Sequence, residues 1–248
     1  SKLLQLDADF RVVVMERESV MPEPPTSIGD HDRANFDLHF NNRLQVETAA
    51  FGELSFGATF RGTDMFVCGP KSLNARETVD FVKQEVNDVC IVFGCDLIKG
   101  DLLRALPALS LNFHLGLSPW FKGSATLFWP FYFMEPQCSG ITIHKIVAAA
   151  DAGEVLHQSV PILKKGMGIH DVGVATVLQG ANDLVNALKK ILSGTELSFT
   201  PQTINGRLFL TRDFEPQHLR VNYDLFNDRM VDEYLAGQLG NKTPKLIA

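Results

Sequence analysis

The sequence lacks long hydrophobic runs, basic clusters and a basic leader followed by an apolar stretch. A membrane-spanning helix requires roughly 18 apolar residues, and no run reaches that length. Acidic residues (29) outnumber basic ones (23), and the close basic pairs are limited to 164–165 and 189–190. We therefore expect a soluble cytoplasmic protein with neither a membrane nor a nucleic-acid partner.

Cysteine is scarce, with four residues in a chain of 248. Cys68, Cys90, Cys95 and Cys138 show no CxxC spacing, and three of them sit in apolar or strand-like surroundings. This pattern favours buried, reduced thiols over a disulfide framework or a zinc site.

Several common catalytic motifs are missing as well. The sequence contains no GxSxG, no Walker loop and no GxGxxG, so the serine-hydrolase, P-loop and ordinary dinucleotide-binding interpretations lack their motifs. A chain of this length buries roughly 70% of its unfolded surface. It fits one large domain, or one domain with a small appendage.

Strand-like and helix-like segments alternate along the chain. We expect strands at 10–15, 65–69, 88–94 and 109–114, and helices at 37–51, 73–86, 102–106 and 171–192. The continuous apolar run at 88–94 is typical of a strand buried on both faces. This order predicts a doubly wound, mostly parallel α/β sheet, whose ligands lie outside the carboxyl ends of the strands.

Less regular segments complete the pattern. Prolines 22, 24 and 25 predict a loop over 21–32. Residues 139–163 are typical of two strands joined through a small-residue turn at 149–154. For the helix at 171–192, Asp171 is the expected N-cap and Gly194 the stop signal.

Asn112 and His114 are candidate catalytic residues at the end of the strand 109–114. Side chains alternate along a strand, so the two should point to the same face. A turn, 119–123, follows closely. Such a pair can also serve only to bind loop backbone, and Asp151, which precedes Ala-Gly, can be a plain turn residue.

The block 111–158 resembles the formyltransferases that use N10-formyltetrahydrofolate. The resemblance rests on Asn112-Phe113-His114 with a Pro-containing loop ending in Gly123, and on Asp151 before a small-residue turn and a strand. Within that family, the sequence is most similar to small enzymes that formylate nucleotide-linked amino sugars.

The resemblance implies a Rossmann-like, mostly parallel sheet with flanking helices. Residues 1–194 would form the catalytic domain, and 195–248 a strand or hairpin with helices that serve as a possible dimerisation element, giving a homodimer. Family members open with a strand in the middle of the sheet. No such strand precedes Ser1, so we expect that the chain lacks the first strand.

The chemistry of formyl transfer suits these residue types. Attack of an amine on a formyl carbonyl builds negative charge on oxygen and releases a proton. Asn112 can donate to that oxygen. His114 can donate to it when protonated, or accept the proton when neutral, while Asp151 would hold the imidazole or an ordered water.

The resemblance also implies two binding regions. Formyltetrahydrofolate is expected against an apolar wall of residues that are otherwise plausible sheet core: Phe93, Gly94, Cys95, Leu97, Ile98, Val147, Ala148, Ala149 and Ala150. The amine acceptor is expected beside the turn, at Ser118, Trp120, Phe121, Lys122 and Gly123. There, aromatic rings can stack on a sugar or base and the lysine can meet a phosphate, whereas Trp129 and Phe131 are expected to pack internally.

The predicted function is therefore N-formylation of a nucleotide-linked dideoxy amino sugar, such as dTDP-4-amino-4,6-dideoxyglucose or its 3-amino isomer, for polysaccharide biosynthesis. Another small amine, a formyltetrahydrofolate hydrolase and a catalytically silent folate-binding relative remain alternatives. A metal site combining His144 and His157 with His114 and Asp151 is disfavoured by mixed spacing and the lack of a second carboxylate.

Overall fold

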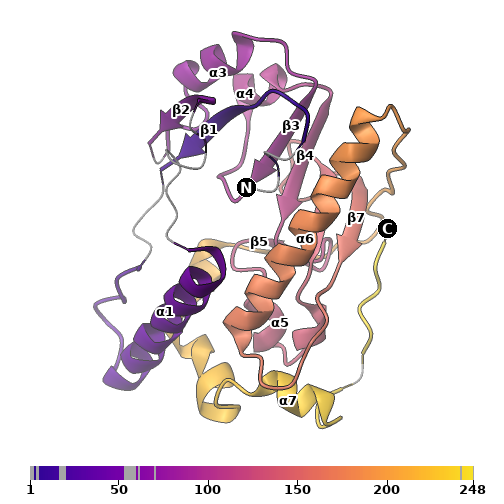
Figure 1. Cartoon of the computed structure of the whole chain (residues 1–248). Coiled ribbons are helices and arrows are strands. Elements are labelled where there is room, and N and C mark those ends of the chain that lie inside the picture. Colours follow the sequence, from indigo (N-terminus) through magenta and orange to yellow (C-terminus); the bar gives the residue numbers. More distant parts are fainter. Residues whose placement is uncertain are drawn as a thin grey trace.

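The computed structural model describes residues 3, 6–16, 21–52, 60, 62–69, 71–240 and 242–247. Their strands are β1 (Arg11–Met15), β2 (Asp64–Cys68), β3 (Val89–Phe93), β4 (Leu109–His114), β5 (Phe121–Gly123), β6 (Ile141–Lys145), β7 (Val155–Ser159) and β8 (Arg207–Phe209). The helices are α1 (Asp30–Phe51), α3 (Arg76–Lys83), α4 (Gly100–Ala105), α5 (Trp129–Tyr132), α6 (Ile169–Leu192) and α7 (Met230–Leu235). The predicted α/β class is confirmed (Figure 1).

The central sheet has four strands in the order β3-β4-β6-β7. β3 and β4 are parallel, but β6 is antiparallel to both β4 and β7. The short turn between β6 and β7 permits only antiparallel pairing, since a parallel pair needs a long crossover. Two further parallel pairs, β1-β2 and β5-β8, form separate two-stranded sheets, so parallel pairing holds for three of the five strand pairs that the structure describes but for only one of the three in the central sheet.

β3 is less buried than its apolar sequence predicts. The strand lies at an edge of the four-stranded sheet, its first four residues are half-buried and Phe93 is exposed. The expectation of burial on both faces was therefore wrong. An apolar run can also place side chains against a cavity, and sequence does not distinguish the two cases.

α6 covers one face of the central sheet (Figure 1). Leu184 and Leu188 from the helix share a core with Leu111, Phe113, Ile141 and Ile143 from β4 and β6. The helix begins at Ile169, so Asp171 is not its N-cap; instead the Asp171 carboxylate accepts the Gly168 N–H at 2.9 Å from within the first turn. The expected end is confirmed, since Gly194 follows with φ +72°.

α1 starts at Asp30, which shortens the predicted loop and lengthens the predicted helix. Two acidic residues in the first turn, Asp30 and Asp32, favour a helix N-terminus there. The helix is held to the chain after α6, residues 195–240, which we call the C-terminal segment. Arg220 of this segment donates to both Asp32 oxygens at 2.7 and 2.9 Å. Figure 1 shows α1 in purple beside that yellow segment.

α3 is shorter than predicted at both ends, and its N-cap is Ala75. The residue before this N-cap is Asn74. Its side chain bonds the Leu97 carbonyl and the Lys99 N–H, at 3.0 and 2.8 Å. This contact fixes the loop after β3, in which several predicted cofactor residues lie.

A second core joins the C-terminal segment to the loop after β4. Trp129 and Phe131 are 2% and 1% exposed, which confirms their expected internal packing. They share this core with Phe209, Leu219 and Met230. A dimerisation role for the segment stays a prediction.

The described cysteines are free thiols, with Cys68 and Cys138 buried and Cys90 and Cys95 half-buried. Among the described residues, no helix combines the length and apolar character needed to cross a membrane.

Candidate active site

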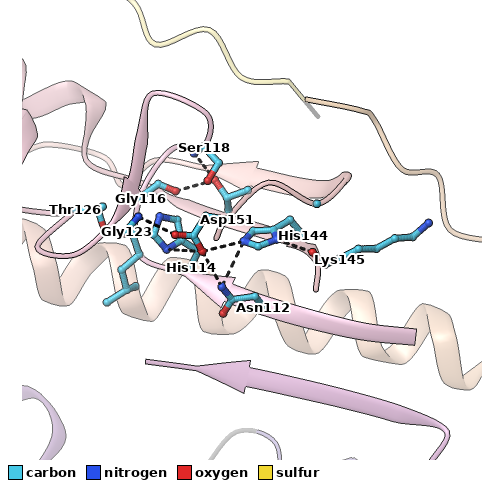
Figure 2. Close-up of polar contacts among 12 residues, drawn as sticks. Asn112, His114, Gly116, Ser118, Gly123, Thr126, His144, Lys145 and Asp151 are labelled. Carbon is cyan, nitrogen blue, oxygen red and sulfur yellow. Dashed lines mark hydrogen bonds and ion pairs between the residues drawn. The ribbon is translucent and has the colours of Figure 1, made fainter. Parts of the chain in front are cut away.

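Asn112 and His114 lie on one face at the end of β4, as the strand alternation predicts (Figure 2). Register with the antiparallel β6 places His144 opposite Asn112 and Thr142 opposite His114. The two sequence candidates therefore lie beside a second histidine.

Asp151 is presented by the turn between β6 and β7. Its backbone has φ +48°, a conformation that non-glycine residues rarely adopt. Gln202 stabilises the turn, because its Nε2 donates to the carbonyls of Asp151 and Gly153 at 3.0 and 2.7 Å. A Cβ at position 153 would lie 1.9 Å from the Lys145 carbonyl oxygen, so the close approach of turn and β6 requires glycine there.

The structure brings the three predicted catalytic residues together (Figure 2). Asn112 Nδ2 donates to Asp151 Oδ1 at 3.0 Å, and the Gly123 N–H donates to Oδ2 at 2.7 Å. His114 Nδ1 lies 3.6 Å from the same Oδ1. Asp151 thus connects the end of β4 with the turn that follows it.

The contacts of His114 define its protonation. Its Nε2 lies 2.8 Å from the Phe121 carbonyl oxygen, which can only accept, so Nε2 carries the hydrogen and Nδ1 faces Asp151. Burial lowers the pKa of His114 below its ordinary 6.5, while Asp151 and the Phe121 carbonyl partly oppose that shift. The imidazole is therefore neutral at pH 7, with a proton-accepting Nδ1.

Asp151 is a carboxylate at any physiological pH. Burial raises its pKa, but the His144 contact, the His114 ring and the Gly123 N–H outweigh burial and lower the pKa to about 2. A buried anion beside a neutral imidazole stabilises the positive charge that the imidazole gains on taking up a proton.

Sequence reasoning missed the role of His144. The side chain is buried, its Nδ1 donates to the Lys145 carbonyl at 2.8 Å, and its Nε2 lies 3.3 Å from Asn112 Nδ2 and 3.4 Å from Asp151 Oδ1. The signal was strand alternation, which becomes informative only once the antiparallel register with β4 is known. His157 instead contacts Asp183 at 3.4 Å, and no group of metal-ligating side chains occurs in the described part of the chain.

The loop after β4 supports His114 through a close backbone approach. A Cβ at Gly116 would lie 2.6 Å from the Phe121 carbonyl oxygen and 2.7 Å from His114 Nε2. Thr142 fixes the same loop, because its Oγ1 accepts from the Ser118 N–H at 2.9 Å and donates to the Gly116 carbonyl at 2.7 Å. Position 116 thus admits only glycine without displacing the imidazole.

A cavity of about 1080 Å³ opens beside these residues. Asn112, His114, His144 and Asp151 all line it. The lining also includes most of the predicted cofactor residues: Phe93, Gly94, Cys95, Leu97, Ile98, Val147, Ala149 and Ala150. Ala148 is exposed nearby and does not contribute to the lining formed by the described residues.

The predicted acceptor residues are placed differently. Gly123 lines the cavity, but Ser118 and Phe121 are buried, and Phe121 stacks on Phe209 at 6.1 Å. Trp120 and Lys122 are half-buried and do not belong to the lining formed by the described residues. Their role in acceptor binding stays a prediction. The far wall, formed by α1, α6 and the C-terminal segment, was not anticipated.

Comparison with known proteins identifies the family. A sequence model described as formyl transferase matches residues 22–187, which is most of the chain. The chain belongs to the formyl transferase family. The family and the enzyme class predicted from the Asn112, His114 and Asp151 motifs are therefore confirmed.

Solved formyl transferases show a similar fold. A phosphoribosylglycinamide formyltransferase from Anaplasma phagocytophilum aligns with a TM-score of 0.54 and 16% identity, covering 82% of this chain and 100% of its own. A sugar N-formyltransferase from a Shewanella species aligns with a TM-score of 0.51 and 14% identity, covering 82% and 77%. At such identities the likeness concerns the fold.

Proposed function

We propose that this formyl transferase moves a formyl group from N10-formyltetrahydrofolate to the amine of a nucleotide-linked amino sugar. The observation that carries the proposal is the contact of the anionic Asp151 with both Asn112 and His114 at the wall of one cavity. These are the groups that formyl transfer requires: a donor for the developing oxyanion, a base and a counter-charge.

The apolar wall suits the flat ring of a folate. Phe93, Leu97 and Val147 are 54%, 49% and 39% exposed, although they line a cavity. Large apolar side chains left exposed around a concave surface are typical of ligand sites. The backbone of the loop after β3 supplies polar groups beside them.

His114 acts as the base in this proposal. Its neutral state and the Nε2 bond to Phe121 leave Nδ1 to accept the proton that the attacking amine loses. Asp151 then stabilises the imidazolium from 3.6 Å. The sequence left two roles open for His114, a neutral base or a protonated donor to the formyl oxygen. Its burial favours the neutral base, because burial lowers the pKa of His114.

Asn112 provides the donor to the formyl oxygen. Both Nδ2 hydrogens have partners, Asp151 at 3.0 Å and His144 at 3.3 Å. The longer contact, to the His144 ring nitrogen, is the one that a developing oxyanion replaces, because the shorter hydrogen bond to the Asp151 carboxylate is charge-assisted and stronger. The Asp151 contact meanwhile keeps the amide oriented.

The acceptor is the finer part of the proposal. Resemblance of the segment 114–131 to the sugar enzymes supports an amino sugar, while the fold is shared with both a sugar N-formyltransferase and a phosphoribosylglycinamide formyltransferase. Cytoplasmic location and a homodimer formed through residues 195–248 belong to the same proposal.

The test is tetrahydrofolate release from N10-formyltetrahydrofolate, measured with nucleotide-linked 3-amino and 4-amino dideoxy sugars, with glycinamide ribonucleotide and with no acceptor. Release that requires an amino sugar is expected. Tetrahydrofolate release that requires glycinamide ribonucleotide would show that this amine, and not an amino sugar, is the acceptor. Release without any amine identifies a hydrolase, and folate binding without release identifies a silent relative; either result overturns the proposal.

A further inference from the structure

The cavity extends beyond the reacting residues to a histidine pair that the proposed chemistry does not use. Gly123, whose N–H binds Asp151, leads along the chain to Phe128, which contacts the His39 ring edge-on at 6.3 Å. His39 from α1 and His170 from α6 line the same cavity as Asp151. The reacting residues and the histidine pair therefore face one continuous cavity.

The histidine pair is built into the protein interior. The two rings lie 4.4 Å apart, and His39 Nδ1 is 3.0 Å from the Tyr223 hydroxyl. His170 Nε2 is buried and has no hydrogen-bond partner among the residues that the structure describes. A buried polar atom without a partner costs free energy and points to a ligand group at that position.

Arg43 adds a positive charge to this part of the cavity. It lies one helical turn after His39 on α1, lines the same cavity, and its Nε is 3.3 Å from Glu47 Oε1. Both side chains of that ion pair are substantially exposed, so the pair is weak and leaves Arg43 free to bind a better-placed anion.

The charged groups around the pair limit what binds there. Asp171 and Asp228 accept the Gly168 and Ile169 N–H groups at the start of α6, so these amides are already used. The Arg43 guanidinium donates in its charged state, and the His39 and His170 rings donate from both nitrogens once they are protonated, so together they match a phosphate rather than a cation.

We propose that His39, His170 and Arg43 form a subsite for a phosphate group of the acceptor. This inference rests on the proposed function, because it assigns the amine end of the same molecule to the His114–Asp151 end of the cavity. The hydroxyls of Ser124 and Thr211, 3.1 Å apart, belong to residues that also line the cavity, and they offer further contacts to the acceptor.

Phosphate binding at this subsite takes up protons. Burial lowers the pKa of His39, with His170 and Arg43 adding to the shift. Burial likewise lowers the pKa of His170 to about 4, with Arg43 adding to it and Asp171 opposing it. Both rings are neutral at pH 7, and a phosphate beside them raises both pKa values. Affinity for phosphate therefore increases as the pH falls.

The experiment titrates the full chain with inorganic pyrophosphate and follows the ring C–H signals of the histidines by NMR, with affinity measured by calorimetry. Arg43→Gln and His170→Asn are compared with Arg33→Gln, a control on the same helix, whose side chain donates to the Pro25 carbonyl at 3.4 Å and lies outside the cavity lining formed by the described residues. We expect pyrophosphate to shift the His39 and His170 signals, and both test variants to weaken binding at least about tenfold.

Equal affinity in the intact chain, Arg33→Gln and Arg43→Gln would overturn the subsite. Arg43 is half-exposed, so its substitution tests the subsite without disturbing the core. In the transfer assay, Arg43→Gln is expected to raise KM for a phosphate-bearing amine while kcat stays within about twofold. Pyrophosphate binding by a chain that does not transfer formyl groups would contradict the proposed function but not the subsite. Formyl transfer whose KM is unchanged by Arg43→Gln would contradict the subsite but not the proposed function.

Discussion

Asn112 Nδ2 lies 3.0 Å from Asp151 Oδ1, although 39 residues separate the two in the sequence. The contact joins the end of β4 to the turn after β6, so two motifs that look separate in the sequence form one hydrogen-bonded unit. His114 and His144 both lie within 3.6 Å of the same oxygen. The Asp151 carboxylate is therefore the centre of the site, and loss of its charge affects every other member.

Replacement of Asp151 by asparagine is expected to lower kcat by about 100- to 1000-fold, because the protonated His114 loses its counter-charge. Asp183→Asn is the matched control: its carboxylate is similarly buried, 15% exposed against 10%, but binds Ser159 and lies outside the described cavity lining. Rates of tetrahydrofolate release check the result. Equal losses in both variants would contradict a special role for Asp151.

The pH profile should report the protonation of His114. Burial lowers the His114 pKa below 6.5, so kcat/KM is expected to be constant near neutral pH and to fall as the pH drops through that lowered pKa. Asp151 raises the His114 pKa, so the acid limb should move to lower pH in Asp151→Asn. A limb that moves to higher pH in this variant would refute the assignment of His114 as the base.

Gly116→Ala is expected to reduce activity by about 100-fold and to destabilise the fold, because the new Cβ displaces either the Phe121 carbonyl or the His114 ring. Gly240→Ala is the control, since among the described residues no atom beyond its chain neighbours lies within 4 Å of a Cβ there. Thermal midpoints and turnover separate the two effects. Full activity of Gly116→Ala would show that the loop after β4 does not fix His114.

Gln202 is a positioning residue, because it holds the Asp151 turn and not the substrate. Gln202→Met keeps the length of the side chain but removes both hydrogen bonds, and we expect kcat to fall about 10- to 100-fold. The acid limb should shift in the same direction as in Asp151→Asn, which a purely structural loss would not produce. Gln45→Met, at an exposed position of α1, should leave the pH profile unchanged.

Local sequence pattern predicted much of this protein. β4 has the predicted bounds, and β3 lies within one residue of them at each end. Asn112 and His114 share a face because alternation along a strand is a local property. Their contact with Asp151 was expected only from the family resemblance, because no local sequence pattern shows which residues on different elements meet.

Features that depend on long-range pairing were not predictable. The direction of β6 decides that His144, and not only Asp151, meets Asn112. The start of α1 and its attachment to Arg220 depend on a contact across most of the chain. The cavity wall of His39, Arg43 and His170 likewise combines two distant helices, each of which has an ordinary composition.

Formation of the N-formylated amine, followed by mass spectrometry together with tetrahydrofolate release, tests the central claim most directly. The account predicts one formylated acceptor for each tetrahydrofolate released by the intact chain, and loss of both products together in Asp151→Asn. Tetrahydrofolate accompanied by free formate, with the amine unmodified, would contradict it.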